Sequence, residues 1–187
     1  MERPKYYHGS DTQITDGYLR TNKQFNNKQD DVVSGVFVTS DKNWAKYFAI
    51  HHCIGQGMGF QLGNKIILEQ LLSHIKPNFY IYTVYEDSEK PFIHDHDNEY
   101  YSTQDIKIAE SEKFDTTAEI EKLGFEIYVL NEPLKSKIDI ESGNNFAVRT
   151  EMLQAITENK IHRVDIAGLI SQQQKHKIPP TPTRTIC

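Results

Sequence analysis

The sequence contains few cysteines and no long hydrophobic run. Its 187 residues include two cysteines, Cys53 and Cys187, too few for the disulfide framework of a small secreted domain. No apolar stretch approaches the roughly 20 residues of a transmembrane helix. The first residues, Met-Glu-Arg-Pro-Lys, lack the apolar segment of a signal peptide. We therefore expect a cytoplasmic protein without membrane contact, or one exported by a route that needs no such signal.

Positive charge is also scarce. The chain has 26 acidic and 21 basic residues, which gives a formal net charge of −5. A general nucleic-acid binder normally presents a basic face, so this balance argues against one. The hydrophobic content of 37% is low, but ten tyrosines and nine phenylalanines are enough to build a packed core. The length suits a single domain.

The pattern of apolar residues predicts strands and helices in irregular order. We expect strands over 5–9, 35–39, 79–85 and 125–130, and near 151–156 and 162–170. Helices are expected after a Ser40 cap, over 65–75 and over 116–123. Polar or glycine-rich composition predicts loops over 21–34, 55–59 and 86–103. Because strands and helices do not alternate regularly, the sequence predicts an α+β fold rather than a doubly wound sheet.

Three short motifs lie within the first 50 residues. They are Tyr7-His8-Gly9-Ser10 at a strand end, Gly35-Val36-Phe37-Val38-Thr39 on a second strand, and Ala45-x-Tyr47 on the following helix. Glycine lets a ligand approach the backbone closely, and histidine offers both a donor and an acceptor nitrogen. Aromatic rings make favourable contacts with a cationic ring. The order and spacing of the three motifs carry the interpretation, since each one alone occurs by chance.

Together these motifs resemble the ADP-ribosyltransferase superfamily, whose members cleave NAD at its glycosidic bond. The resemblance covers about the first 50 residues well, the last third loosely and the middle poorly. It implies two small packed β-sheets that flank an NAD cleft, with helices outside. We expect one such domain over 1–170, with a divergent middle over 50–115 and a flexible tail over 171–187.

The resemblance implies a role for each residue of the motifs. His8 would bond a ribose hydroxyl, and the backbone of Gly9, with Ser10 beside it, would hold the carboxamide of nicotinamide. Tyr47 would stack on the nicotinamide ring. Phe37 stands where the poly(ADP-ribose) polymerases carry tyrosine, so the apolar wall is kept and a hydroxyl is lost.

The resemblance also implies two charged groups. Arg20 stands where the family places a basic residue against the pyrophosphate. A carboxylate on a later strand, usually glutamate, bonds the ribose 2′-hydroxyl and stabilises the positive charge that develops as nicotinamide leaves. Glu151, which begins an expected strand, is our assignment for this acid. The rifampin-type enzymes of the family resemble the chain in another segment, which makes Asp139 the second candidate.

Two further segments have residues that could form binding sites. His94 and His96 could ligate a divalent metal, but their acidic loop offers no second pair of ligands to close a tetrahedral site, so we expect no metal. The segment Gly55-Gln56-Gly57-Met58-Gly59 does not match the spacing of a phosphate-binding loop. It is interpreted as a flexible linker.

The resulting hypothesis is an NAD-dependent ADP-ribosyltransferase that modifies a protein or small-molecule acceptor. NAD is its substrate, and plain NAD hydrolysis is a close variant of the reaction. The divergent middle suits a bacterial effector or toxin that recognises one target, which would reach a host cell without a signal peptide. Two alternatives stay open: a non-catalytic module of the same fold that binds a nucleotide or protein, and a metal-binding protein using His94 and His96.

Overall fold

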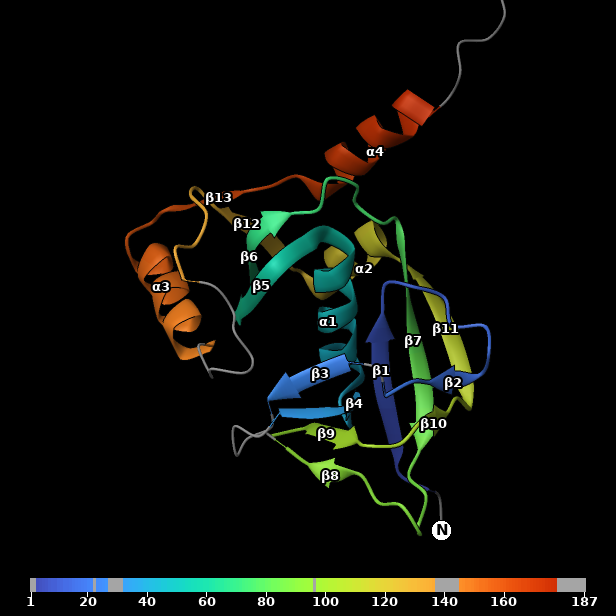
Figure 1. The fold of residues 1–187 in the computed structure, drawn as a ribbon. Helices are drawn as coiled ribbons and strands as arrows, with labels where there is room; N and C mark the ends of the chain where they lie inside the picture. Colours follow the sequence, from blue (N-terminus) through green and yellow to red (C-terminus); the bar gives the residue numbers. More distant parts are fainter. Residues whose placement is uncertain (1–2, 22, 27–31, 96, 137–144, 178–187) are drawn as a thin grey trace, which may run out of the picture.

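The computed structural model describes residues 3–21, 23–26, 32–95, 97–136 and 145–177. In this part of the chain four helices lie around several β-sheets (Figure 1). The α+β class expected from the sequence is therefore confirmed. Two residues weighed above, His96 and Asp139, lie outside the described residues.

The largest sheet is antiparallel. Its main path has the strand order β11-β7-β1-β4-β9-β8. The bounds are β1 (Lys5–Ser10), β4 (Val32–Thr39), β7 (Asn78–Tyr85), β8 (Ile93–His94), β9 (Glu99–Ser102) and β11 (Glu110–Asp115). A further strand, β3 (Lys23–Asn26), pairs with the first half of β4.

The two central strands of this sheet separate from each other. β1 pairs with β7 along all six of its residues, whereas its register with β4 holds the single pair Tyr7↔Thr39. The preceding residues of β4 pair with β9 on the other side. The sheet therefore opens beyond Tyr7, between the end of β1 and the middle of β4, because each strand stays bonded to its outer neighbour.

A second sheet has the order β13-β12-β6-β5. It consists of β5 (Gly55–Leu62), β6 (Lys65–Leu71), β12 (Glu126–Leu130) and β13 (Ile161–Arg163). β6 and β12 are parallel, while the other pairs are antiparallel. Gly63 turns the β5–β6 hairpin with a φ of 61°, a left-handed conformation that glycine adopts without strain. A small ladder joins β2 (Tyr18–Leu19) to β10 (Ile106–Lys107).

Helix α1 (Lys42–Ile54) lies between the two larger sheets, near the centre of the molecule (Figure 1). Asp41 caps it by accepting hydrogen bonds from the backbone N–H groups of Asn43 and Trp44. Its buried residues include Ala49, Ile50, Cys53 and Ile54, all fully excluded from solvent. They share one core with residues of both sheets: Ile66, Leu68, Phe79, Ile81, Ile127 and Val129. Burial of each large aliphatic side chain contributes roughly 1.5–3 kcal/mol.

A buried ion pair joins α1 to α2 (Thr116–Leu123). Lys46 Nζ lies 2.7 Å from Glu119 Oε2, and the two side chains are 8% and 9% exposed. The ammonium group also lies 4.4 Å from the centre of the Phe114 ring. α2 follows the sequence prediction closely: Asp115 caps it, and Gly124 ends it in a left-handed conformation with φ 68°.

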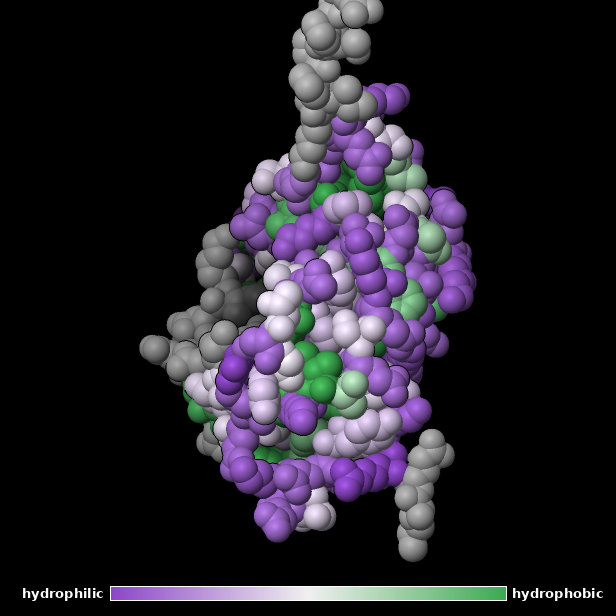
Figure 2. All heavy atoms as spheres, turned by 90° about the vertical axis from the view of Figure 1, so that its right-hand side faces the viewer, coloured by the Kyte–Doolittle hydropathy of each residue, from purple (hydrophilic) through white to green (hydrophobic). Residues whose placement is uncertain are grey.

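Two other helices lie near the end of the described chain. α3 (Asn145–Thr157) packs against the second sheet through Val148 and Met152. α4 (Ile166–Lys177) begins against the main core with the buried residues Ile166 and Ile170, and its second half extends away from the body of the molecule (Figure 1). No described helix is long and apolar enough to cross a membrane. The face that carries β11 and β2 is mostly hydrophilic, with small hydrophobic areas between polar side chains (Figure 2).

Several sequence expectations for secondary structure were wrong. The helix expected over 65–75 is strand β6, whose consecutive residues Ile66, Ile67 and Leu68 are all buried because layers cover both of its faces. A short apolar run of this kind does not distinguish helix from strand. The strand expected near 151–156 is part of α3, and its buried residues Val148 and Met152 follow helical spacing.

The remaining differences concern segments expected as loops. The expected loop over 21–34 contains β3 and the start of β4, and the acidic loop over 86–103 contains β8 and β9. The strand expected over 162–170 ends at Arg163, and the expected tail from 171 continues as α4 to Lys177. The glycine-rich linker is strand β5, because hydrogen bonding to β6 orders it despite its composition.

Candidate functional site

A cavity of about 900 Å³ opens where β1 and β4 separate. Its walls come from β1, β4, the inner face of α1, the loop before β2, and Gly57–Gly59 of β5. The six residues assigned to NAD binding all line it: His8, Gly9, Ser10, Arg20, Phe37 and Tyr47. The volume lies within the range of small-molecule sites in proteins. The three residues expected to converge from the motifs, His8, Phe37 and Tyr47, thus lie around one cavity.

His8 bridges the gap between the separating strands. Its Nδ1 lies 2.8 Å from the backbone carbonyl oxygen of Phe37. A carbonyl only accepts, so Nδ1 carries the proton in this bond. The bond fixes both the tautomer and the orientation of the imidazole at the cavity wall.

The packing of α1 against β1 requires glycine at position 9. A Cβ atom at this position would lie 2.0 Å from the backbone carbonyl oxygen of Ala45 and 3.0 Å from the Cβ of Ala49. Helix α1 therefore crosses β1 at a distance that only glycine permits. The sequence predicts close approach by a ligand at Gly9, and the structure shows close approach by the helix.

The aromatic residues of α1 form a cluster beside the cavity. The rings of Trp44 and Tyr47 are stacked, with centroids 4.9 Å apart and an interplanar angle of 19°. Phe48 contacts both rings. Burial, with a smaller contribution from the negative charge of Glu99, raises the pKa of Tyr47 to about 12. The Tyr47 hydroxyl is therefore protonated at neutral pH and can donate a hydrogen bond.

Glu99 is the carboxylate that sequence reasoning missed. It begins β9, pairs with Thr39 of β4, and lines the same cavity as His8 and Tyr47. Its Oε1 accepts a hydrogen bond from Trp44 Nε1 at 2.7 Å. The segment Glu99-Tyr100-Tyr101-Ser102 falls in the expected acidic loop, although its adjacent tyrosines are typical of a strand. These two tyrosines are the sequence signal that indicates β9.

Glu151, the acid assigned from the sequence, has a different setting. It lies on α3, and not on a strand as expected. Its carboxylate accepts hydrogen bonds from the backbone N–H groups of Lys135, at 2.7 Å, and Ser136, at 2.8 Å. These bonds, that from Lys135 first, lower the pKa of Glu151. Glu151 is not among the residues that line the cavity, and its two hydrogen bonds fix the chain after β12 to α3.

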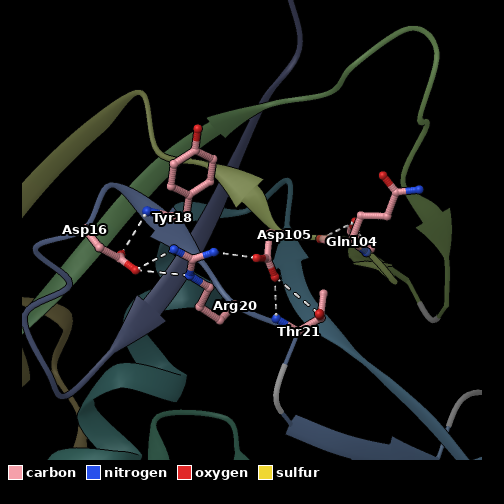
Figure 3. A network of polar contacts seen from close by, with 7 residues as sticks. Asp16, Tyr18, Arg20, Thr21, Gln104 and Asp105 are labelled. Carbon is pink, nitrogen blue, oxygen red and sulfur yellow. Dashed lines mark hydrogen bonds and ion pairs between the residues drawn. The ribbon is translucent and has the colours of Figure 1, made fainter.

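Arg20 lies at the cavity between two carboxylates (Figure 3). Its Nε and Nη2 donate to Asp16 Oδ2 at 3.0 and 2.8 Å, and its Nη1 donates to Asp105 Oδ2 at 2.6 Å. Asp105 also accepts from the backbone N–H of Thr21. The network joins the ends of β2 to the start of β10, so Arg20 has a structural role here. A pyrophosphate would have to share the guanidinium with these two carboxylates.

The sequence motifs did not predict a second wall of the cavity. His51 and His52 of α1 and the segment Gly57–Gly59 of β5 line it. The His51 ring lies against Gly59, where a Cβ atom would be 2.2 Å from His51 Cδ2. The segment read as a linker therefore closes one side of the cavity, and its glycine lets the imidazole fit.

The metal alternative gains no support from the described residues. His94 Nε2 lies 2.9 Å from the backbone carbonyl oxygen of Asp97, a contact that stabilises the turn between β8 and β9. No group of three or more histidine, cysteine or acidic side chains within the described part of the chain is placed to hold a metal ion. The expectation of no metal at His94 and His96 stays a prediction, since His96 is not described.

Comparison with known proteins gives no relative. No protein-family model, curated protein or solved structure matches this chain. In the cavity, a histidine bonded to the Phe37 carbonyl, a buried tyrosine and a carboxylate, drawn from β1, α1 and β9, lie around one space.

Proposed function

We propose that the chain is an NAD-dependent ADP-ribosyltransferase, with Glu99 and not Glu151 as its charge-stabilising acid. The observation that carries the proposal is that His8, Tyr47 and Glu99, from three elements distant in sequence, line one cavity. The sequence motifs imply the first two residues, and Glu99 supplies the carboxylate on a later strand that the same resemblance requires.

Three residues of the cavity each have a proposed role in binding NAD. The Tyr47 ring, backed by Trp44, offers a flat surface on which a cationic nicotinamide ring can stack. His8 lines the cavity with its Nδ1 bonded to the Phe37 carbonyl, and its other ring nitrogen is proposed to contact a ribose hydroxyl. Phe37 provides an apolar wall without a hydroxyl.

Glu99 has the charge that the bond cleavage needs. Loss of nicotinamide leaves positive charge on the ribose, which a nearby carboxylate stabilises more in the transition state than in the ground state. Among the described residues, Trp44 is the hydrogen-bond donor to the Glu99 carboxylate, and it reaches Oε1. The second oxygen, Oε2, is then the group that can accept from a ribose hydroxyl.

The test is to follow both halves of NAD. The protein is incubated with NAD labelled on its adenylate and with lysates or small-molecule acceptors, and nicotinamide release and label transfer are measured. We expect nicotinamide release that depends on Glu99. Transfer of label identifies a transferase, and release of free ADP-ribose identifies a glycohydrolase.

A matched control separates this activity from contamination. Glu110 also begins a strand of the main sheet, but its strand β11 lies at the far edge and it does not line the cavity. Glu110→Gln should retain nicotinamide release, and Glu99→Gln should lose it. Binding of NAD by the wild-type protein without any release would instead favour a non-catalytic module.

A further inference from the structure

The sole tryptophan of the chain connects α1 to the start of β9. Trp44 Nε1–H donates to Glu99 Oε1 at 2.7 Å, across 55 residues of sequence. A hydrogen bond from a neutral donor to an ionised carboxylate is stronger than one between neutral groups. This contact is therefore able to hold the carboxylate in one orientation.

The same indole ring supports the tyrosine of the cavity. It is stacked on Tyr47, with ring centroids 4.9 Å apart, and it meets Phe48 edge to face at 5.3 Å. Trp44 itself is not among the residues that line the cavity, whereas Tyr47, Phe48 and Glu99 are. It lies behind the wall and contacts three residues that form it.

The backbone around both partners is fixed independently. The Asp41 side chain accepts from the backbone N–H of Trp44 at the first turn of α1. Glu99 is held by its register with Thr39 of β4. The backbone N–H of Ser40 donates to the carbonyl oxygen of Asn98 at 3.1 Å. The start of α1 and the start of β9 are thus both anchored to the end of β4, so the backbone holds Trp44 and Glu99 close to each other.

We propose that Trp44 is a positioning residue: its indole N–H orients the Glu99 carboxylate, and its ring sets the plane of Tyr47, so that one side chain aligns both groups. The catalytic consequence rests on the proposed function, whereas the hydrogen bond does not. Trp44 does not reach the reacting atoms, and it acts through the orientation of Glu99 and Tyr47.

The variant that tests this is Trp44→Phe, which keeps a stacking ring and removes the N–H donor. Loss of one hydrogen bond to a charged group should lower kcat for nicotinamide release by about 10- to 100-fold. KM should change much less, because the ring that supports Tyr47 is retained. Simple loss of packing would not produce this separation of kcat from KM.

Phe114→Leu is the matched control for loss of aromatic packing against α1. Phe114 lies on β11, contacts Lys46 of α1, and does not line the cavity. It should lower thermal stability while leaving kcat close to that of the wild type. An equal fall of kcat in Trp44→Phe and Phe114→Leu would overturn the positioning role.

A spectroscopic measurement decides the contact without any turnover. Because the chain has one tryptophan, its indole N–H gives a single resonance in a ¹⁵N–¹H spectrum. We expect this proton to be shifted downfield and protected from exchange in the wild type. Glu99→Ala should remove both properties, and Glu99→Gln, whose neutral amide oxygen still accepts, should give an intermediate shift.

The outcomes are distinguishable. An indole resonance that is unchanged in Glu99→Ala overturns the inference, even if Trp44→Phe fails to fold. A wild-type protein that releases no nicotinamide refutes the proposed function and the catalytic part of the inference, while the indole spectrum still decides the contact. Full kcat in Trp44→Phe, with activity lost in Glu99→Gln, leaves the function standing and overturns the positioning role.

Discussion

His8 Nδ1 and the carbonyl oxygen of Phe37 are 2.8 Å apart, although 29 residues separate them in sequence. The bond spans the point where β1 and β4 part, so it both closes the sheet and orients the imidazole at the cavity. Two roles of one side chain are thereby assigned to its two nitrogens. Nδ1 holds the two strands together, and we propose that Nε2 is the atom that contacts a ligand.

Substitutions that mimic one nitrogen each should separate these roles. His8→Asn places an amide N–H near the position of Nδ1, so it should retain most of the stability and lose the ribose contact. His8→Gln reaches toward Nε2, so it should lose roughly 0.5–1.5 kcal/mol of unfolding free energy and bind NAD better than His8→Asn. Urea unfolding and NAD titration of both variants measure the two effects. The reverse order of NAD affinities would contradict the assignment.

Gly9→Ala should damage both the fold and the site. The new methyl group would meet the Ala45 carbonyl, which is backbone and cannot rotate away, so α1 must shift. Overpacking of this kind typically costs 1–3 kcal/mol. Because Tyr47 and Trp44 lie on α1, we expect NAD turnover to fall as well. Denaturant unfolding measures the loss of stability, and kcat measures the loss of turnover.

The control for this change is Gly63→Ala in the β5–β6 turn. It meets no atom within 4 Å and carries only the cost of a left-handed backbone, about 1–2 kcal/mol. Gly63→Ala should lower stability and leave turnover unchanged. If both variants retained turnover equally, the position of α1 would not matter to the site.

The buried pair of Lys46 and Glu119 should make stability depend on pH. Burial alone would raise the pKa of Glu119, but the hydrogen bonds from Lys46 and Lys122 outweigh it and hold the pKa below its usual value. The folded state therefore binds this proton less readily than the unfolded state. The contribution is fully present above the pKa of an unfolded glutamate, near 4.3, and is lost as pH falls through the lower value of the folded state.

Substitutions of Lys46 and Glu119 should also reveal how much this ion pair contributes to stability. Glu119→Gln leaves a buried ammonium without its partner charge and should cost about 3–5 kcal/mol of unfolding free energy at pH 7. The double variant Lys46→Met, Glu119→Leu should recover most of that loss, because neither charge is then buried. Urea unfolding across a double-mutant cycle checks both expectations. A double variant as unstable as Glu119→Gln would show that packing, and not charge, explains the cost.

The first part of the site could be predicted from the sequence because its motifs are local. His8, Phe37 and Tyr47 each follow from a short segment, and the glycines and aromatics in those segments have few other uses. Glu99 could not be found in the same way. Its four-residue strand is defined by pairing with β4, about 60 residues earlier, and that partner is not visible in the local sequence.

The errors in secondary structure have related causes. β6 has a run of buried aliphatic residues that fits a helix equally well until its neighbours, β5 and β12, are known. The apolar residues from Glu151 onward fit a strand when taken alone. Their helical spacing is visible only when Val148, one helical turn before Met152, is included. Glu151 was expected on a strand, whereas it lies on a helix and does not line the cavity.

The central claim is that Glu99 is the acid of an NAD-cleaving site, and the kinetics of Glu99→Gln test it most directly. Removal of one preorganised electrostatic contact should lower kcat by roughly 10²–10³-fold. The Kd for NAD should change far less, because the charge acts mainly in the transition state. Glu151→Gln and Asp139→Asn, measured beside it, should keep wild-type turnover. Full turnover in Glu99→Gln, with a collapse in either of the other two variants, would contradict the account.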